Sequence, residues 1–158
     1  MPPTPRDMEE AHMSRGISLL EDTFPAAPGS GIVAQRVVVM DAANSGDVKL
    51  PASPPEATAV GASAENISAA NNLAVQLAGV AVLQSDGSAV INPGDYLVAS
   101  GTTGQVKTQA IAVPASPGVQ ANWNLYNIIG MCVDDAQIPA TAGTPVAVRL
   151  GQFLMFAA

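Results

Sequence analysis

The stretch that decides the fold runs from Asn72 to Gln109 and reads NLAVQLAGVAVLQSDGSAVINPGDYLVASGTTGQVKTQ. Its apolar runs are rich in β-branched residues and are separated by turns that contain Gly, Pro, Asn and Asp. Such runs are typical of antiparallel strands, and glycine reaches the positive-φ conformations that hairpin turns need. The stretch contains no reactive side chain, so it predicts architecture rather than chemistry.

The same texture continues on both sides of this stretch. Further strand-like runs are Ile32–Ala34, Val37–Met40, Val48–Leu50, Thr58–Ser63, Ile128–Val133, Pro145–Leu150 and Phe153–Phe156. Pro51–Glu56 holds three prolines, which favours a loop or a sheet edge over a central strand. Ala64–Asn71 is either a loop or one turn of helix. The sequence therefore predicts a mainly β domain.

Two parts of the chain follow the same order of motifs. The first part runs Val37–Met40, Gly46–Lys49, Val60–Ser63 and Val75–Leu77, and the second runs Tyr96–Ala99, Gly104–Lys107, Ile129–Cys132 and Val148–Leu150. Either this is coincidence among strands rich in Val, Gly and Ala, or the domain consists of two related β-units folded together. We predict the second arrangement, because the four matches occur in the same order.

The composition limits the partners of the protein. Its 158 residues are enough for one domain and a tail, and 48% are hydrophobic while only 12% are charged. A surface with so little charge favours packing against copies of the chain or against another protein. Six basic residues against thirteen acidic ones give a formal charge of -7, and no basic patch or aromatic platform is visible. We therefore expect no nucleic-acid partner.

Residues 1–30 differ from the rest of the chain. They hold prolines at positions 2, 3, 5, 25 and 28, and a charged segment, Arg6–Arg15, that is long enough for two or three helical turns. The alternatives are a frayed tail and an arm that becomes ordered on a neighbour. The second is favoured, because the segment contains more apolar side chains than a solvated tail needs. The expected contacts of this arm with a neighbouring molecule are Ile17, Leu19, Leu20 and Phe24. Residues 1–30 are thus predicted to form an extended arm and linker, and residues 31–158 a β-rich domain.

The chemistry of an enzyme is missing from the sequence. His12 is the single imidazole, and Cys132, the single cysteine, lies in an apolar strand-like run that predicts a buried side chain. Asp134 and Asp135 are adjacent at a strand end, which is typical of a turn. No catalytic, phosphate-binding or metal-binding motif is present. We predict a protein that is not an enzyme, with no catalytic residues, no metal and no cofactor.

The two ends of the chain carry their own expectations. The first residues lack the apolar segment of a secretory signal, and no apolar run reaches the roughly 20 residues of a membrane span. We therefore expect no membrane partner and synthesis in the cytoplasm. The apolar C-terminal run, Phe153–Phe156, is expected to pair as a last strand or to enter a subunit interface.

From Gly31 to Leu150 the chain resembles the head decoration, or capsid cement, proteins of tailed bacteriophages. The motifs that carry the resemblance are structural: Val37–Met40, Gly46–Val48, Ala59–Ala62, Asn92–Ala99, Gly104–Val106, Ile129–Val133 and Gly143–Leu150. The resemblance implies a small β-barrel or β-tulip domain, usually a homotrimer. It also implies binding to the major capsid protein on the outer surface of the virion's capsid, at threefold or quasi-threefold positions. Terminal arms reach over adjoining subunits in this family, and an arm of about 30 residues is longer than in its compact members.

A threefold arrangement would bury the apolar C-terminal strand and a loop with aromatic side chains between copies. The expected subunit-interface residues are Trp123, Tyr126, Phe153 and Phe156. Two alternatives remain open. A tail or fibre component of the same particle would share the β-rich, low-charge texture. A β-sandwich carbohydrate-binding module would usually display several exposed aromatic side chains, whereas this chain has one Trp, two Tyr and three Phe.

Overall fold

The computed structural model describes residues 17–29, 31–52, 59–67, 71–110 and 124–157. Within these residues every regular element is a β-strand, and no helix occurs. The strands are β1 (Ile17–Pro25), β2 (Val37–Met40), β3 (Val48–Lys49), β4 (Ala59–Ser63), β5 (Asn72–Gln84), β6 (Tyr96–Ser100), β7 (Gln105–Thr108), β8 (Asn124–Cys132) and β9 (Pro145–Ala157).

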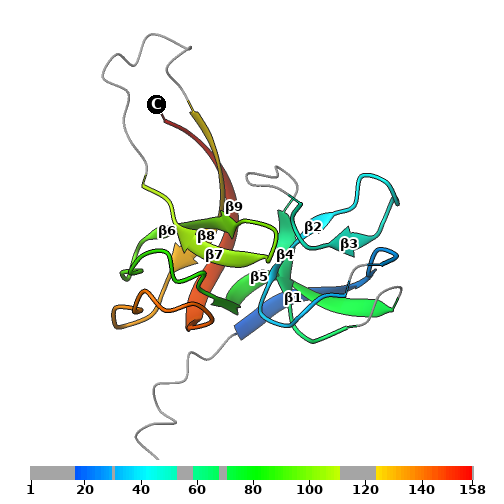
Figure 1. The fold of residues 1–158 in the computed structure, drawn as a ribbon, viewed down its shortest axis with the longest axis horizontal. Helices are drawn as coiled ribbons and strands as arrows, with labels where there is room; N and C mark the ends of the chain where they lie inside the picture. The colour runs from blue at the N-terminus through cyan, green and yellow to red at the C-terminus, as the bar shows by residue number, and fades with distance from the viewer. Residues whose placement is uncertain (1–16, 30, 53–58, 68–70, 111–123, 158) are drawn as a thin grey trace, which may run out of the picture.

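The strands form one strongly curved antiparallel sheet with the order β3-β2-β4-β5-β9-β8-β6-β7, and β1 lies beside β5 (Figure 1). The order is symmetric about the central β5–β9 pair. Outward from β5 the sheet continues through β4 and β2 to β3, and outward from β9 it continues through β8 and β6 to β7. The four strands β2–β5 therefore correspond, in chain order, to the four strands β6–β9.

The strand registers confirm the predicted repeat. Glycines pair at the same place in both units, Val38 with Gly61 and Leu97 with Gly130. Three further register pairs of the first unit correspond to three of the second: Val39–Lys49 to Val98–Lys107, Met40–Val48 to Ala99–Val106, and Ser63–Val75 to Cys132–Val148. Agreement at the level of single residue pairs excludes coincidence between similar strands.

Each unit curls until its ends meet. In the first unit the chain that follows β1 forms a parallel bridge between Ala26 and Val48, and in the second the chain that follows β5 forms one between Ser85 and Val106. Strand β1 thus has the same role in the first unit that the second half of β5 has in the second. Long strand β5 belongs to both units, because its first half pairs with β4 and β1 and its second half pairs with β9.

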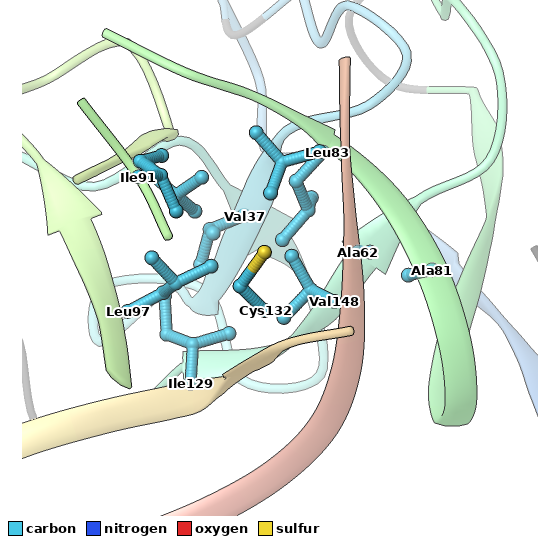
Figure 2. Close-up of a cluster of buried hydrophobic side chains, with 11 residues drawn as sticks. Val37, Ala62, Ala81, Leu83, Ile91, Leu97, Ile129, Cys132 and Val148 are labelled. Atoms are coloured by element: carbon cyan, nitrogen blue, oxygen red, sulfur yellow. The ribbon is translucent and has the colours of Figure 1, made fainter. Parts of the chain in front are cut away.

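The sheet has two hydrophobic cores built on equivalent positions. The first core contains Ala26, Ile32, Val38, Val48, Leu73 and Val75, with Phe24 and Ile67 among the side chains packed against it. The second core contains Ile91, Leu97, Val106, Val146 and Val148 at the corresponding positions, together with Ala81, Leu83, Ile129 and Cys132 (Figure 2). It also includes Val37 and Ala62 of the first unit, so the second core extends across both units. The fold is therefore a small barrel-like β-domain of two related units, as the sequence predicts.

Two glycines allow the strands to approach at equivalent places. A Cβ atom on Gly61 would lie 2.2 Å from the carbonyl oxygen of Gln76, and one on Gly130 would lie 2.2 Å from that of Arg149. Real Cβ atoms do not approach a carbonyl oxygen this closely, so both positions need glycine where the backbones of neighbouring strands come together.

Part of the chain before residue 31 belongs to the sheet. Residues 17–25 form β1, which pairs with β5 from Ile17–Val80 to Pro25–Asn72, and Ala26 and Ala27 are buried. The apolar side chains that favoured a docking arm are therefore in part explained by a strand within the same chain. The proposed helical segment Arg6–Arg15 lies outside the described residues.

Candidate interaction surface

Strand β1 has one open edge. It pairs with β5 on one side, and within the described residues no strand pairs with its other side. Leu20 on this strand is 55% exposed, the largest value among the exposed large hydrophobic residues. The register with β5 is irregular on both sides of Leu20. An open edge with an exposed apolar side chain is suited to pairing with another strand.

A second open edge lies along the end of β9. Strand β5 pairs with β9 only as far as the Gly79–Leu150 pair, whereas β8 follows β9 to the Asn124–Ala157 pair. Because β5 and β8 lie on opposite sides of β9, the β5 side of residues 151–157 has no strand partner within the described residues. The paired ends of β8 and β9 extend away from the body of the sheet (Figure 1).

One buried polar atom lies on this extension. The side-chain oxygen Oδ1 of Asn127 is buried and accepts no hydrogen bond from the described residues. Asn127 is on β8 and pairs with Leu154 of β9. Buried acceptors are nearly always satisfied in folded proteins, and none of the described residues donates to this one. Asn127 lies one strand away from the open edge of β9, because β8 and β5 flank β9 on opposite sides.

Other apolar side chains are exposed on the loops and strand ends. These are Val33, Val90, Tyr96 and Val133, whose exposed fractions range from 37% to 50%. Single exposed apolar residues are normal on a protein surface and need no partner. The open strand edges are therefore the more specific candidates for binding.

A polar cluster joins the two units. The guanidinium of Arg36 donates a hydrogen bond to Oε1 of Gln84, and Nε2 of Gln84 donates to Oε1 of Gln35 at 3.1 Å. Partial burial lowers the pKa of Arg36, although the guanidinium stays charged at any pH at which the protein is folded. The backbone N–H of Gln84 also donates to the carbonyl of Gln35. These groups satisfy one another, so we assign them to holding the units together rather than to binding a ligand.

The carboxylate of Asp134 has a structural role, and the thiol of Cys132 is buried. Oδ2 of Asp134 accepts the N–H of Ala147 at 2.7 Å, which fastens the turn after β8 to β9. Cys132 is buried, as predicted, and burial raises the pKa of its thiol, which disfavours the reactive thiolate. Among the described residues no group of three or more His, Cys, Asp or Glu side chains could hold a metal ion. The same part of the chain contains no helix long and apolar enough to cross a membrane.

The structure places the sequence-predicted contact residues that it describes on β1, β8 and β9, without testing their roles. Leu20 and Phe24 lie on β1, where Leu20 is exposed and Phe24 packs against the first core. Ile17 and Leu19 belong to the same strand. Tyr126 lies on β8, and Phe153 and Phe156 lie on β9. Trp123 and His12 are outside the described residues.

Sequence reasoning missed the relation between the two edges. In the repeat, three segments occupy equivalent places: β1, the second half of β5 and the end of β9. The signal was present in the sequence: extending the repeat alignment beyond Leu150 matches Gln152–Ala157 to Gly79–Gln84.

No protein-family model matches the chain. Over 59 residues the chain is 34% identical to mouse cadherin-15, an alignment that covers 37% of this chain and 7% of the cadherin. The chain therefore spans less than a tenth of that relative. The solved N base of the head fiber gp8.5 of bacteriophage phi29 is similar over 86% of this chain and 100% of that chain, with 12% identity and a TM-score of 0.47. These likenesses do not assign the chain to a family.

Proposed function

We propose that the protein is a structural component of a bacteriophage head, a decoration or cement protein. In this proposal it binds the major capsid protein as a homotrimer on the outer surface of the shell, at threefold or quasi-threefold positions, and stabilises the shell without any turnover. The phi29 protein named above is a head fiber, which agrees with this proposal, but the proposal does not depend on that likeness.

The observation that carries the proposal is the pair of open strand edges on a domain whose order of motifs resembles the decoration family. Both edges include residues that the sequence predicts as contacts: Leu20 and Phe24 lie on β1, and Phe153 and Phe156 lie on β9. A binding role needs such edges, whereas an enzyme needs a positioned acid, base, nucleophile or metal. The low charge of the surface fits long-lived contacts with neighbours, because charged residues are depleted from the cores of interfaces.

Binding through several weak contacts suits a cement. An edge, an arm and a trimer axis that engage one shell together act at high effective concentration, so the combined affinity exceeds that of each contact. A shell under internal pressure is reinforced by molecules that cross the boundaries between its subunits. These considerations support the cement role without requiring any group that the chain lacks.

The direct test is sedimentation of the purified protein with empty phage heads. We expect the protein to pellet with heads and to raise the temperature at which the heads break open. Labelled electron microscopy of virions then distinguishes the head surface from the tail. Label on the tail alone would favour the tail or fibre alternative, and binding on a glycan array without head binding would favour the carbohydrate-binding alternative.

The contribution of the N-terminal segment needs a deletion that spares β1. Removing residues 1–16 leaves Ile17–Pro25 in place, so the first unit keeps all its strands. We expect this variant to show the circular dichroism of the full protein and a weaker affinity for heads. Unchanged affinity would show that the contact with the shell does not involve residues 1–16.

A further inference from the structure

The repeat supplies a strand that has no partner on one side among the described residues. In each unit the first strand pairs with the start of the last strand: β1 with β5, and the second half of β5 with β9. The registers correspond residue by residue, since Phe24–Leu73 matches Leu83–Val146. By the same correspondence Gln152–Ala157 at the end of β9 matches the first strand of a unit, and no described strand pairs with its β5 side.

Residues 152–157 of β9 have the residue types that the first strand of a unit needs. The buried positions of the second unit's first strand are Leu83 and Ala81, which are 0% and 1% exposed. The corresponding residues of β9 are Phe156 and Leu154, which are also apolar. On β1 the corresponding residues are Phe24 and Asp22, so β1 has a carboxylate where the other two strands have an apolar residue.

Strand β1 pairs less regularly with β5 than the second half of β5 pairs with β9. Its register with β5 is broken between Ser18 and Leu20 and again between Leu20 and Glu21, whereas the pairs from Gly79–Leu150 to Gln84–Pro145 run without a break. A strand with irregular register, an exposed leucine and a carboxylate in place of an apolar residue is easier to displace from β5 than a regular one.

We propose that copies of the chain exchange strands: residues 152–157 of one copy pair with the first half of β5 of a second copy, in the place that β1 takes in the isolated chain. The expected register sets Met155 of one copy opposite Ala74 of the other and Phe156 opposite Leu73. The contact is head-to-tail, so it closes as a ring when the rotation between copies allows it. The displaced β1 then extends the N-terminal segment away from the barrel.

The exchange closes the open edge of β9. Leu154, which pairs with Asn127 of β8 on one side, is brought opposite Val75 of the second copy on its other side. The inference rests on the self-association part of the proposed function and is independent of what the oligomer binds.

Three cysteine pairs at one register position test the exchange. Thr23–Ala74 joins β1 to β5, Val82–Ala147 joins β5 to β9, and both occupy equivalent places in the two units. The variants Thr23→Cys/Ala74→Cys, Val82→Cys/Ala147→Cys and Met155→Cys/Ala74→Cys therefore share one pairing geometry. Each also carries Cys132→Ser, because Ser63 is the residue at that place in the first unit.

Light scattering of the 158-residue protein without the introduced cysteine pairs should give the mass of an oligomer, at least twice the 15.9 kDa of one chain. Oxidised Met155→Cys/Ala74→Cys should form disulfides between copies on a non-reducing gel. Oxidised Thr23→Cys/Ala74→Cys should lock β1 in place and give the monomer mass, which reduction should convert back to the oligomer. Val82→Cys/Ala147→Cys should form a disulfide within one chain and leave the mass unchanged.

Three results would overturn the exchange: a monomeric full-length protein, an oligomer that survives the oxidised β1 lock, or an oligomer in which Met155→Cys/Ala74→Cys forms no disulfide between copies. Sedimentation with heads is measured separately on the same variants. If the unmodified protein is monomeric and binds heads, the strand exchange is refuted and the head-binding proposal stands. If the protein forms the exchanged oligomer but does not sediment with heads, the strand exchange stands and the head-binding proposal is refuted.

Discussion

The glycines at equivalent places in the two units let the repeat be tested one residue at a time. In Gly61→Ala and Gly130→Ala the new methyl group meets a backbone carbonyl oxygen at 2.2 Å, and backbone cannot move aside as a flexible side chain can. We expect each substitution to lower the free energy of unfolding by about 3 kcal/mol, measured by urea denaturation. Gly31→Ala is the control, since its nearest atom is 3.8 Å away, and it should change stability by less than about 0.5 kcal/mol. A mild effect at Gly61 beside a severe one at Gly130 would contradict the equivalence.

Gln35 has a backbone conformation that the second unit gives to a glycine. Its φ is 61°, Gly94 at the corresponding place has φ 86°, and each donates its N–H to the residue that ends β4 or β8. Left-handed φ costs a residue with a side chain about 1 kcal/mol or more. We therefore expect Gln35→Gly to be more stable than Gln35→Ala by about 1 kcal/mol, because both lose the hydrogen bond with Gln84 and only glycine relieves the strain. Thermal unfolding of the two variants measures the difference, and equal stability would show that the position is not strained.

Asp41 makes the stability depend on pH at the acid end. The hydrogen bond from Nδ2 of Asn44, at 2.7 Å, lowers the pKa of Asp41 below its ordinary value of 3.8, burial opposes this, and Lys49 at 3.3 Å adds to it. A carboxyl whose pKa is lower in the folded protein binds fewer protons there than in the unfolded chain. Its contribution to stability is therefore present above about pH 4 and is lost as the pH falls below that value. In Asp41→Asn the urea midpoint should fall less between pH 5 and pH 3 than in the unmodified protein, and an identical fall would contradict this role.

At the scale of elements, closure of the two units depends on very short strands. Val48 of β3 and Val106 of β7 are both fully buried and form the parallel bridges that bring the ends of each unit together. We expect Val48→Ala and Val106→Ala each to lower the free energy of unfolding by about 2 kcal/mol, because each leaves a cavity at a closing contact. Chemical denaturation should give values within about 1 kcal/mol of each other. Exposed Val33→Ala is the control, with an expected change below about 0.5 kcal/mol.

The sequence predicts most of the strands, and the reason is visible in their residues. Val37–Met40 and Val146–Leu150 are apolar runs bounded by turn residues, and local pattern is enough to place such strands. Strand β1 could not be placed in this way, because Glu21 and Asp22 interrupt its apolar residues and its partner β5 lies about fifty positions further along the chain. The pairing of β1 follows from the tertiary role of β5, which no window of local sequence contains.

The candidate edges are predictable only in part. The apolar residues near both ends of the chain indicated contact surfaces, but their place on sheet edges depends on the order of strands in the sheet. Gly79, with φ 100°, lies on β5 where the pairings with β1 and β9 overlap, and this use of one strand by two units has no signature in its immediate neighbours. The repeat was the one long-range signal in the sequence, and following it to the last residues leads to the exchange of strands.

The molecule as a whole should unfold in one step although it has two cores. Leu73 and Leu83 lie on the same strand, are both fully buried, and belong to the first and second core respectively. Because β5 provides a strand to each unit, loss of either unit removes a wall of the other. Leu73→Ala and Leu83→Ala should each lower the free energy of unfolding by about 2–5 kcal/mol. Ten residues of strand span at most about 33 Å, and the two side chains belong to different cores, so the double variant should show nearly the sum of the two losses. Urea denaturation followed by circular dichroism and by fluorescence should give one coincident transition in every variant. A variant in which one half of the signal is lost at low urea while the other half persists would show that each unit is stable alone, and that β5 connects the two barrels without coupling them.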